Sequence, residues 1–320
     1  MQSKKLRITS LQFFKFYGIQ MRPYLLFVSG IAGATGMIMT GTVDKNSWQL
    51  LLAFLPFFLG YGFGQALTDC FQTDTDKLSA PYRPLSKGLI SIKQTLIVSI
   101  VGLGMCALIF FFMSYISFLL ALLTVFGLAT YTYFKKKYWF IGPFYNAWIV
   151  ALLPVMGYFA ISSSGLWEFP RSFYPFVLIT FLSYSNFVLI GYLKDIEADR
   201  ETGYRTFPVL FGWQKTLWVG NGIWAITLIL FWAIGGKNFP EILAGILFTI
   251  IVVIGQFKGH LSKNTEPESA TFSIVSTLRG FILIHMALIL HFLPDWWISL
   301  LGYYFLFEMA LFFRPSASQV

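Results

Sequence analysis

Two short stretches of the chain hold half of its carboxylates. Seven of the fourteen acidic residues lie in "TDCFQTDTD" and "YLKDIEADRE", at positions 69, 74, 76, 195, 197, 199 and 201. Each stretch follows a long apolar run and precedes a basic, Pro-containing segment, "PYRPLSKG" or "GYRTFPVLFG". Oxygen ligands without His or Cys favour Mg2+, which keeps several waters and is usually completed by substrate phosphates. The sequence therefore predicts a Mg2+ site for a phosphorylated ligand.

The spacing within each stretch indicates which side chains share a face. Asp195 and Asp199 are four residues apart, which on a helix places both carboxylates within reach of one cation. In the first stretch, Asp69, Gln72 and Asp76 share a helical face in the same way. We therefore expect these five residues to be the metal ligands.

Such a site must lie at the edge of a membrane. The chain is 57% hydrophobic and only 12% charged, about half the charged fraction of a soluble domain. Ten apolar runs are long enough, or nearly so, to cross about 30 Å of hydrocarbon: 24–42, 49–69, 94–114, 117–134, 144–162, 173–194, 216–235, 239–257, 272–292 and 296–313. Runs of this length without alternation predict an all-α, polytopic bundle of nine to ten transmembrane helices around a central cavity.

The basic residues predict how the bundle is oriented. Between the expected spans, 19 Lys and Arg fall on one side and three on the other. The positive-inside rule then places both termini, the acidic clusters and the mouth of the site in the cytoplasm, and an even number of spans is needed for the alternation. The net charge of +9 is explained by these loops, so we expect no nucleic-acid partner.

The positions of the two acidic stretches suggest an internal duplication. They are separated by about 125 residues, and each begins where an apolar run ends. We expect a single membrane domain over 1–320, built from two related halves at about 20–135 and 144–257, with further C-terminal helices over 272–313.

These stretches resemble the two signatures of the UbiA superfamily of membrane prenyltransferases. The second signature, Asp-x-x-x-Asp followed by Arg, Gly, Lys or Arg, Thr and Pro, is similar to Asp195, Asp199, Arg200, Gly203, Arg205, Thr206 and Pro208. The first, Asn-Asp-x-x-Asp-x-x-x-Asp followed by Pro-x-Arg-Pro, is similar to Asp69, Asp76, Pro81, Arg83 and Pro84. "MRPYLLFVSG" and "YTYFKKKYW" also look like this family. Thr68 and Gln72 depart from the pattern, which predicts weaker binding of the first cation.

The resemblance implies Mg2+, an isoprenoid diphosphate substrate and a set of site residues. The catalytic candidates are Asp69, Asp76, Asp195 and Asp199. Basic candidates for binding the diphosphate are Arg83, Lys137, Arg200 and Arg205, together with Arg279, which could instead snorkel outward from its span. Tyr184 and Asn186 lie near the second acidic stretch and either orient an acceptor or bond to a neighbouring helix.

We compare two enzymatic functions and one transport function with these features. In a prenyltransferase, the allylic cation is attacked by an aromatic or lipid acceptor. In a terpene cyclase of the same family, the cation is attacked by a double bond of its own chain and no acceptor is needed. A transporter would carry charges near the middle of its spans, whereas here the charge lies at one face. The prenyltransferase is the leading prediction and the cyclase is the alternative.

Overall fold

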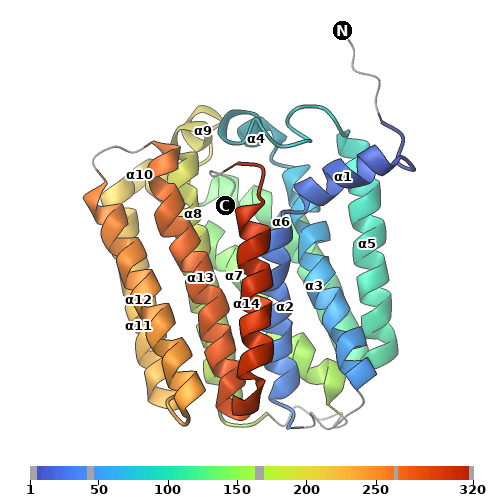
Figure 1. Ribbon diagram of the computed structural model, residues 1–320. Helices are drawn as coiled ribbons and strands as arrows, with labels where there is room; N and C mark the ends of the chain where they lie inside the picture. The colour runs from blue at the N-terminus through green and yellow to red at the C-terminus, as the bar shows by residue number, and fades with distance from the viewer. Residues whose placement is uncertain (1–5, 42–46, 163–168, 263–265, 317–320) are drawn as a thin grey trace.

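The computed structural model describes residues 6–41, 47–162, 169–262 and 266–316, which form a bundle of helices without a strand in these ranges (Figure 1). The helices are α1 (Leu11–Gln20), α2 (Pro23–Ile38), α3 (Ser47–Asp69), α4 (Thr73–Ser79), α5 (Ile92–Met113), α6 (Tyr115–Lys137), α7 (Ile141–Ile161), α8 (Phe173–Gly191), η1 (Tyr192–Asp195), α9 (Ile196–Glu201), α10 (Phe207–Phe211), α11 (Trp213–Ile234), α12 (Phe239–Leu261), α13 (Pro267–Phe292), η2 (Pro294–Trp296) and α14 (Trp297–Phe312).

Each of the ten expected spans coincides with one of the long helices. Eight of these helices have the length and hydropathy to cross a membrane, namely α3, α5, α6, α7, α8, α11, α12 and α13. The other two, α2 and α14, have 16 residues each, which gives about 24 Å at 1.5 Å per residue. The prediction of an all-α transmembrane bundle is therefore confirmed, with two helices shorter than a full crossing.

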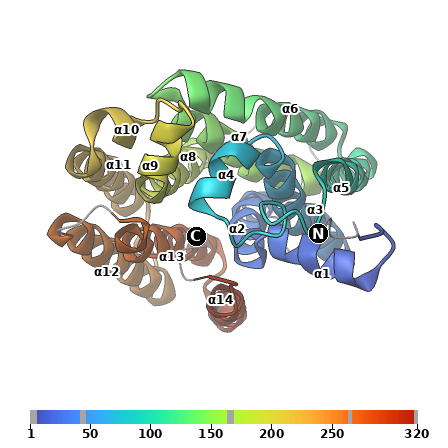
Figure 2. The same ribbon diagram turned by 90° about the horizontal axis from the view of Figure 1, so that it is seen from above.

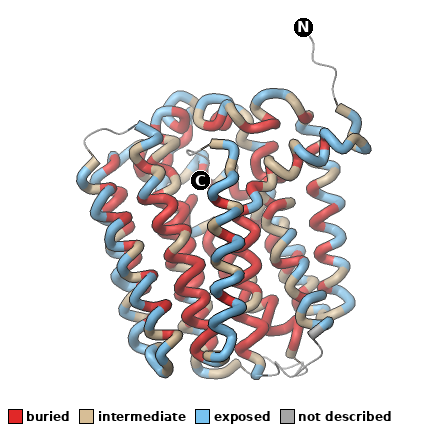
Figure 3. Tube along the Cα trace, in the orientation of Figure 1, coloured by how far each residue is buried: buried red, intermediate tan, exposed pale blue. Residues whose placement is uncertain are grey.

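The long helices form a closed arrangement in chain order. Each of α2, α3, α5, α6, α7, α8, α11, α12 and α13 packs against the next, and α13 returns to α2. Seen from above, α14 lies outside this ring, against α2 (Figure 2). Within this ring α13 is almost wholly buried, whereas α3, α5, α6, α11 and α12 expose much of their surface (Figure 3). Apolar residues on those faces suit contact with lipid.

Glycines allow α2 and α7 to touch through their backbones. A Cβ atom on Gly36 would lie 1.8 Å from the carbonyl oxygen of Pro154, and one on Gly157 would lie 2.1 Å from that of Gly33. Small residues at helix contacts in membranes permit such close approach. This contact fixes one wall of the space that α2, α3, α5, α6 and α7 enclose.

The short helices gather at one end of the bundle. Figures 1 and 2 show α1, α4, α9 and α10 at this end, with α4 and α9 side by side. The described C-terminal segment after α14 lies at the same end (Figure 1). Both acidic stretches are therefore brought together although about 125 residues separate them in the chain.

Candidate active site

The first acidic stretch contains a break between two helices. α3 ends at Asp69 and α4 begins at Thr73, so Asp69, Gln72 and Asp76 do not lie on one continuous helix as the spacing suggested. Backbone turns at Cys70 to Gln72 join the two helices instead. All three side chains nevertheless line the same cavity. The predicted grouping is thus observed, but the turn between the helices produces it.

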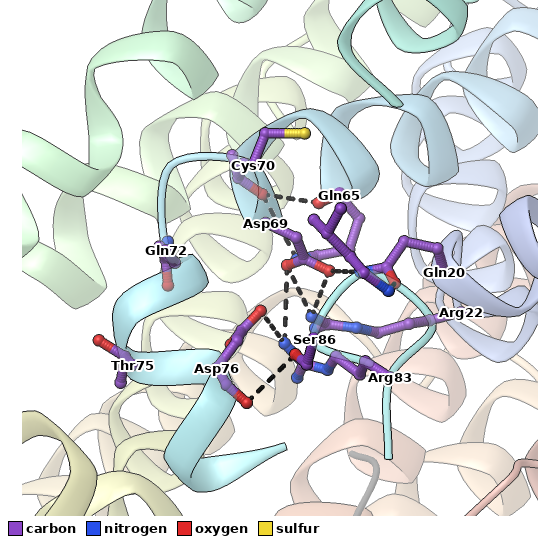
Figure 4. Close-up of polar contacts among 12 residues, drawn as sticks. Gln20, Arg22, Gln65, Asp69, Cys70, Gln72, Thr75, Asp76, Arg83 and Ser86 are labelled. Carbon is purple, nitrogen blue, oxygen red and sulfur yellow. Dashed lines mark hydrogen bonds and ion pairs between the residues drawn. The ribbon is translucent and has the colours of Figure 1, made fainter. Parts of the chain in front are cut away.

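Asp69 is the centre of a buried polar cluster (Figure 4). The Arg22 guanidinium donates to its two oxygens at 2.7 and 2.9 Å. The amides of Gln20 and Gln65 donate to it at 2.5 and 3.0 Å. Arg83 pairs with Asp76 at 2.5 Å and lies 3.8 Å from Asp69. Two cations therefore hold two carboxylates at the mouth of the cavity.

Arg22 has a strained backbone that directs it into this cluster. Its φ is 54° and its ψ is 75°, in the left-handed region, at the start of α2 and directly before Pro23. A residue that precedes Pro is disfavoured in the right-handed helical region, and left-handed non-Gly residues often mark functional sites. The kink between α1 and α2 thus positions a guanidinium that sequence spacing alone does not place.

Burial and neighbouring charges shift the ionisation of the first cluster. Burial lowers the pKa of Arg83, but Asp76 and then Asp69 outweigh this effect and raise it, so the guanidinium stays charged. Burial raises the pKa of Asp76, Arg83 opposes the rise, and the charge of Asp69 adds to it. A cation that binds beside Asp76 would lower its pKa and favour the carboxylate.

The two carboxylates of the second stretch have different surroundings. Asp195 ends the 3-10 helix η1 and lines the cavity. Asp199, in α9, is fully buried and is not among the lining residues. Its oxygens lie 3.4 Å from Lys135 Nζ and 3.0 Å from the Thr206 hydroxyl that donates to it. Of the two carboxylates, only Asp195 therefore lines the cavity, while Asp199 is held outside the lining by Lys135 and Thr206.

Contacts between α4 and α9 connect the two acidic stretches. The hydroxyls of Thr75 and Thr202 are 3.1 Å apart, and Lys136 and Tyr204 contact Asp74 at 3.3 and 3.4 Å. Burial raises the pKa of Asp74, but the Thr75 N–H and Lys136 outweigh it and lower this pKa. Asp74 is therefore an ionised carboxylate on the outer side of the mouth, where its side chain is 45% exposed.

The remaining predicted site residues are divided between the cavity and its exterior. Arg83 and Tyr184 line the cavity. Asn186 is buried against α11, where its amide faces Gly220 and Trp224. The others lie outside the lining: Lys137 donates to Tyr133, Arg200 pairs with Glu197, Arg205 is exposed, and Arg279 pairs with Glu308.

Other residues that line the mouth were not among the predicted site residues. Three are cationic, Arg22, Lys135 and Lys194. Lys135 lies about 5 Å from the ring centroids of Tyr192 and Tyr204. The four-residue spacing of Tyr131 and Lys135 was a usable signal, because both then face the same side of α6. Lys194 is adjacent to Asp195 in the sequence, but only the fold shows that it borders the cavity.

Tyrosines form the wall between the charged mouth and the apolar interior. The hydroxyls of Tyr61 and Tyr184 are 2.5 Å apart, and those of Tyr131 and Tyr192 are 2.6 Å apart. All four line the cavity. Aromatic rings attract cations through their faces, so this wall can tolerate positive charge on a ligand beneath the mouth.

The oxygen donors of the mouth fit Mg2+ that is shared with a phosphorylated ligand. Within the ranges given above, no three acidic, His or Cys side chains are close enough to hold a metal ion alone. Mg2+ commonly takes only one or two carboxylates and completes its shell with waters and phosphates. Asp69 already accepts from three side chains. Asp76 and Asp195 are therefore the better placed carboxylates, with Gln72 as a neutral oxygen donor.

Comparison with known proteins identifies the family. The model of the UbiA prenyltransferase family matches residues 27–289. Digeranylgeranylglyceryl phosphate synthase of Thermococcus kodakarensis is 29% identical over 70% of this chain and 76% of the relative. The synthase of the same name from Sulfurisphaera tokodaii is 28% identical over 72% and 84%.

Solved structures show the same fold. The apo structure of a UbiA homolog from Aeropyrum pernix K1 has a TM-score of 0.68 at 19% identity, over 83% of this chain and 96% of that one. A UbiA homolog from Archaeoglobus fulgidus, solved with GPP and Mg2+, has a TM-score of 0.60 at 22% identity, over 84% and 99%. With the family model matching residues 27–289, the chain belongs to the UbiA prenyltransferase family.

Proposed function

We propose that this protein is a Mg2+-dependent membrane prenyltransferase that ionises an allylic isoprenoid diphosphate and transfers the prenyl group to a lipid acceptor. The observation that carries this proposal is one cavity with two chemical parts. Its mouth holds Asp76, Asp195, Arg83 and Lys135, and its interior, between α3, α5, α6 and α7, is apolar. Such a cavity suits a molecule with a charged head and an isoprenoid tail.

The mouth supports departure of the diphosphate. Negative charge on the leaving group grows as the carbon–oxygen bond breaks, so cations fixed around it stabilise the transition state more than the ground state. Bound Mg2+ would supply Lewis-acid stabilisation of these oxygens. Arg83 and Lys135 are held in place by Asp76 and Asp199 and can contact the diphosphate from two sides. The tyrosine wall then faces the allylic cation.

A lipid acceptor is favoured over an aromatic one by the relatives. Their name describes a product with two geranylgeranyl groups on glyceryl phosphate. An acceptor of this class carries a hydroxyl that attacks the allylic carbon and a phosphate that cationic side chains at the mouth can bind. We infer further that the mouth and both termini face the cytoplasm, which the 19 to 3 distribution of basic residues supports.

The assay uses purified protein with Mg2+ and C10, C15 or C20 allylic diphosphates, with and without a glycerophosphate lipid that bears one isoprenyl chain. We expect a doubly prenylated lipid that forms only with acceptor and is lost with EDTA. A cyclic hydrocarbon formed without acceptor would replace this proposal with the cyclase. Both functions would be contradicted if the diphosphate stayed unchanged in all reactions. The variants Asp76→Asn and Asp195→Asn would then give the same result as the unaltered protein.

A further inference from the structure

Helix α1 lies at the rim of the bundle, at the end that holds the mouth (Figures 1 and 2). The Tyr17 hydroxyl is 2.8 Å from the hydroxyl of Ser99 on α5. The carbonyl of Leu6, before α1, accepts from the side-chain amide of Gln94 on α5 at 2.5 Å. Ser99 lies seven residues after Ile92, where α5 begins, which corresponds to about 10 Å at 1.5 Å per residue. Because α5 has the length and hydropathy of a span, α1 is held at the level of the first turns of a span.

The packed face of α1 leads directly into the mouth. Phe13, Tyr17 and Gln20 are buried on this face. The amide of Gln20 donates to Asp69 at 2.5 Å, and Arg22 follows two residues later with its left-handed backbone (Figure 4). Gln20 and Arg22 are two of the three side chains that donate to Asp69. A strained backbone persists only where its surroundings hold it, so the position of α1 controls the cluster around Asp69.

Two other faces of α1 point away from the bundle. At about 100° per residue, Leu11, Phe14 and Gly18 lie together on one of them. Leu11 is 87% exposed and Phe14 is 53% exposed. Gln12 and Lys15 lie together on the other face, and both are exposed. The helix therefore presents a bundle side, an apolar side and a polar side.

The segment around α1 carries positive charge that the described chain does not neutralise. The first 43 residues include five Lys and Arg and no Asp or Glu. Of these basic residues, Arg22 pairs with Asp69. Arg7 and Lys15 are exposed, and neither forms an ion pair with a carboxylate in the described ranges. The charge of this segment therefore suits an anionic partner.

The level, the apolar side and the positive charge of α1 together fit the surface of a bilayer. An interfacial helix places its apolar side about 5–10 Å into the boundary between headgroups and acyl chains, which suits Leu11 and Phe14. Anionic lipids attract basic segments at the same level, which suits Arg7 and Lys15. A protein partner would not require the apolar side to lie at the depth of the first turns of α5.

We propose that α1 binds anionic phospholipids of the leaflet beside the mouth, and that bound lipid keeps Gln20 and Arg22 on Asp69. The lipid site stands apart from the proposed function, whereas its effect on transfer rests on that function. Two assays on the full chain in nanodiscs test the two halves of this proposal separately.

The first assay measures which lipid surrounds α1. A nitrobenzoxadiazole fluorophore on Gly18→Cys is quenched by spin-labelled phosphatidylglycerol or by spin-labelled phosphatidylcholine, in discs that contain both lipids. Position 18 suits the label because an added Cβ meets no atom within 4 Å, and the native thiols of Cys70 and Cys106 are buried. One Lys or Arg near an anionic surface strengthens the attraction by roughly fivefold, so we expect phosphatidylglycerol to quench at least about twofold more strongly.

Matched variants separate a site on α1 from general attraction to the membrane. Arg7→Gln combined with Lys15→Gln should remove the preference, and raised salt should lower it because exposed charges are screened. Lys87→Gln combined with Lys215→Gln removes the same charge from exposed positions outside α1 and should keep the preference. The fluorophore on Gly104→Cys, at an exposed position of α5, should be quenched equally by both lipids.

The second assay measures prenyl transfer in discs of phosphatidylcholine with and without phosphatidylglycerol. We expect phosphatidylglycerol to raise the rate at least about twofold, by the same attraction. The variant with Arg7→Gln and Lys15→Gln should lose this increase, and the variant with Lys87→Gln and Lys215→Gln should retain it.

The outcomes of the two assays are distinguishable. Equal quenching by the two lipids at position 18 of the otherwise unaltered protein would overturn the lipid site, whatever the rate of transfer. Protection of the fluorophore from both lipids would assign this face to a second copy of the chain or to another protein, and would also overturn it. A preference for phosphatidylglycerol without an effect on transfer would contradict the link to Asp69. Absence of transfer in every disc would contradict the proposed function, and quenching would still decide the lipid site.

Discussion

At the scale of single residues, the mouth depends on buried ion pairs whose partners cannot be removed singly. The side chains of Arg22 and Asp69 are 10% and 3% exposed, and Arg83 with Asp76 is similarly enclosed. Breaking one partner of a buried pair leaves an uncompensated charge, which typically costs about 3–5 kcal/mol. Exposed pairs contribute far less.

Arg22→Gln should therefore destabilise the protein and lower activity together. We expect a loss of about 3 kcal/mol or more, seen as a clear fall in the midpoint of thermal unfolding in detergent. Arg200→Gln, which removes the exposed pair with Glu197, is the matched control and should change the midpoint little. Equal falls in the unfolding midpoint for both variants would show that the buried pair of Arg22 and Asp69 stabilises the fold no more than the exposed pair does.

The lysines after α6 give a second test at this scale. Lys135 lines the cavity and pairs with Asp199, whereas Lys137 is exposed and contacts Tyr133. Lys135→Gln should lower the rate of transfer by at least about a hundredfold, the loss typical of a transition-state donor. Lys137→Gln should stay within about twofold of the unaltered rate. A larger loss of transfer rate in Lys137→Gln than in Lys135→Gln would indicate that Lys137, and not Lys135, acts at the site.

At the scale of helices, the contact between α2 and α7 fixes the cavity wall. Gly157 packs directly on the Gly33 carbonyl, so an added methyl group must separate the two helices. Gly157→Ala should cost about 1–3 kcal/mol of stability. Gly222→Ala is the control, because a Cβ there meets nothing within 4 Å, and it should gain about 0.5–1 kcal/mol from helix propensity. Thermal unfolding in detergent measures both changes.

At the scale of the whole molecule, the charge distribution predicts how the bundle sits in the membrane. Lys87 lies in the connection between α4 and α5, and Lys237 lies between α11 and α12, at the opposite end. Both are exposed, whereas the native thiols of Cys70 and Cys106 are buried. Lys87→Cys should react with a membrane-impermeant maleimide only in inside-out vesicles, and Lys237→Cys only in intact cells. The opposite labelling would invert the proposed topology.

We propose that the chain is one domain built from two related halves, at about 20–135 and 144–257. The hydrogen bond between Thr75 and Thr202 joins the two proposed halves where α4 and α9 meet. The helices over 272–313 then complete the bundle, with α13 packed between the halves and α14 outside.

The sequence predicts the fold more completely than it predicts the details of the site. Long apolar runs and the distribution of Lys and Arg determine the spans, because lipid leaves the backbone few alternatives. The pairing of Arg279 with Glu308 depends on the packing of α13 and α14 and has no local signal. Asp195 lines the cavity whereas Asp199 is buried beside Lys135 and Thr206, and this difference depends on packing that has no local signal in the sequence. Arg22 was noted only as part of a motif, and its place beside Asp69 follows from a strained backbone.

The most direct test of the central claim is calorimetric binding of an unreactive C20 thiolodiphosphate in the presence and absence of Mg2+. If the mouth holds Mg2+ and diphosphate together, binding should require Mg2+ and weaken at least about tenfold in Asp76→Asn and in Asp195→Asn, as expected when a charge-assisted contact worth 1.5–3 kcal/mol is lost. Glu197→Gln, an exposed carboxylate change in the same segment as Asp195, should bind normally. Binding that is independent of Mg2+ and unchanged in all three variants would contradict the proposed site.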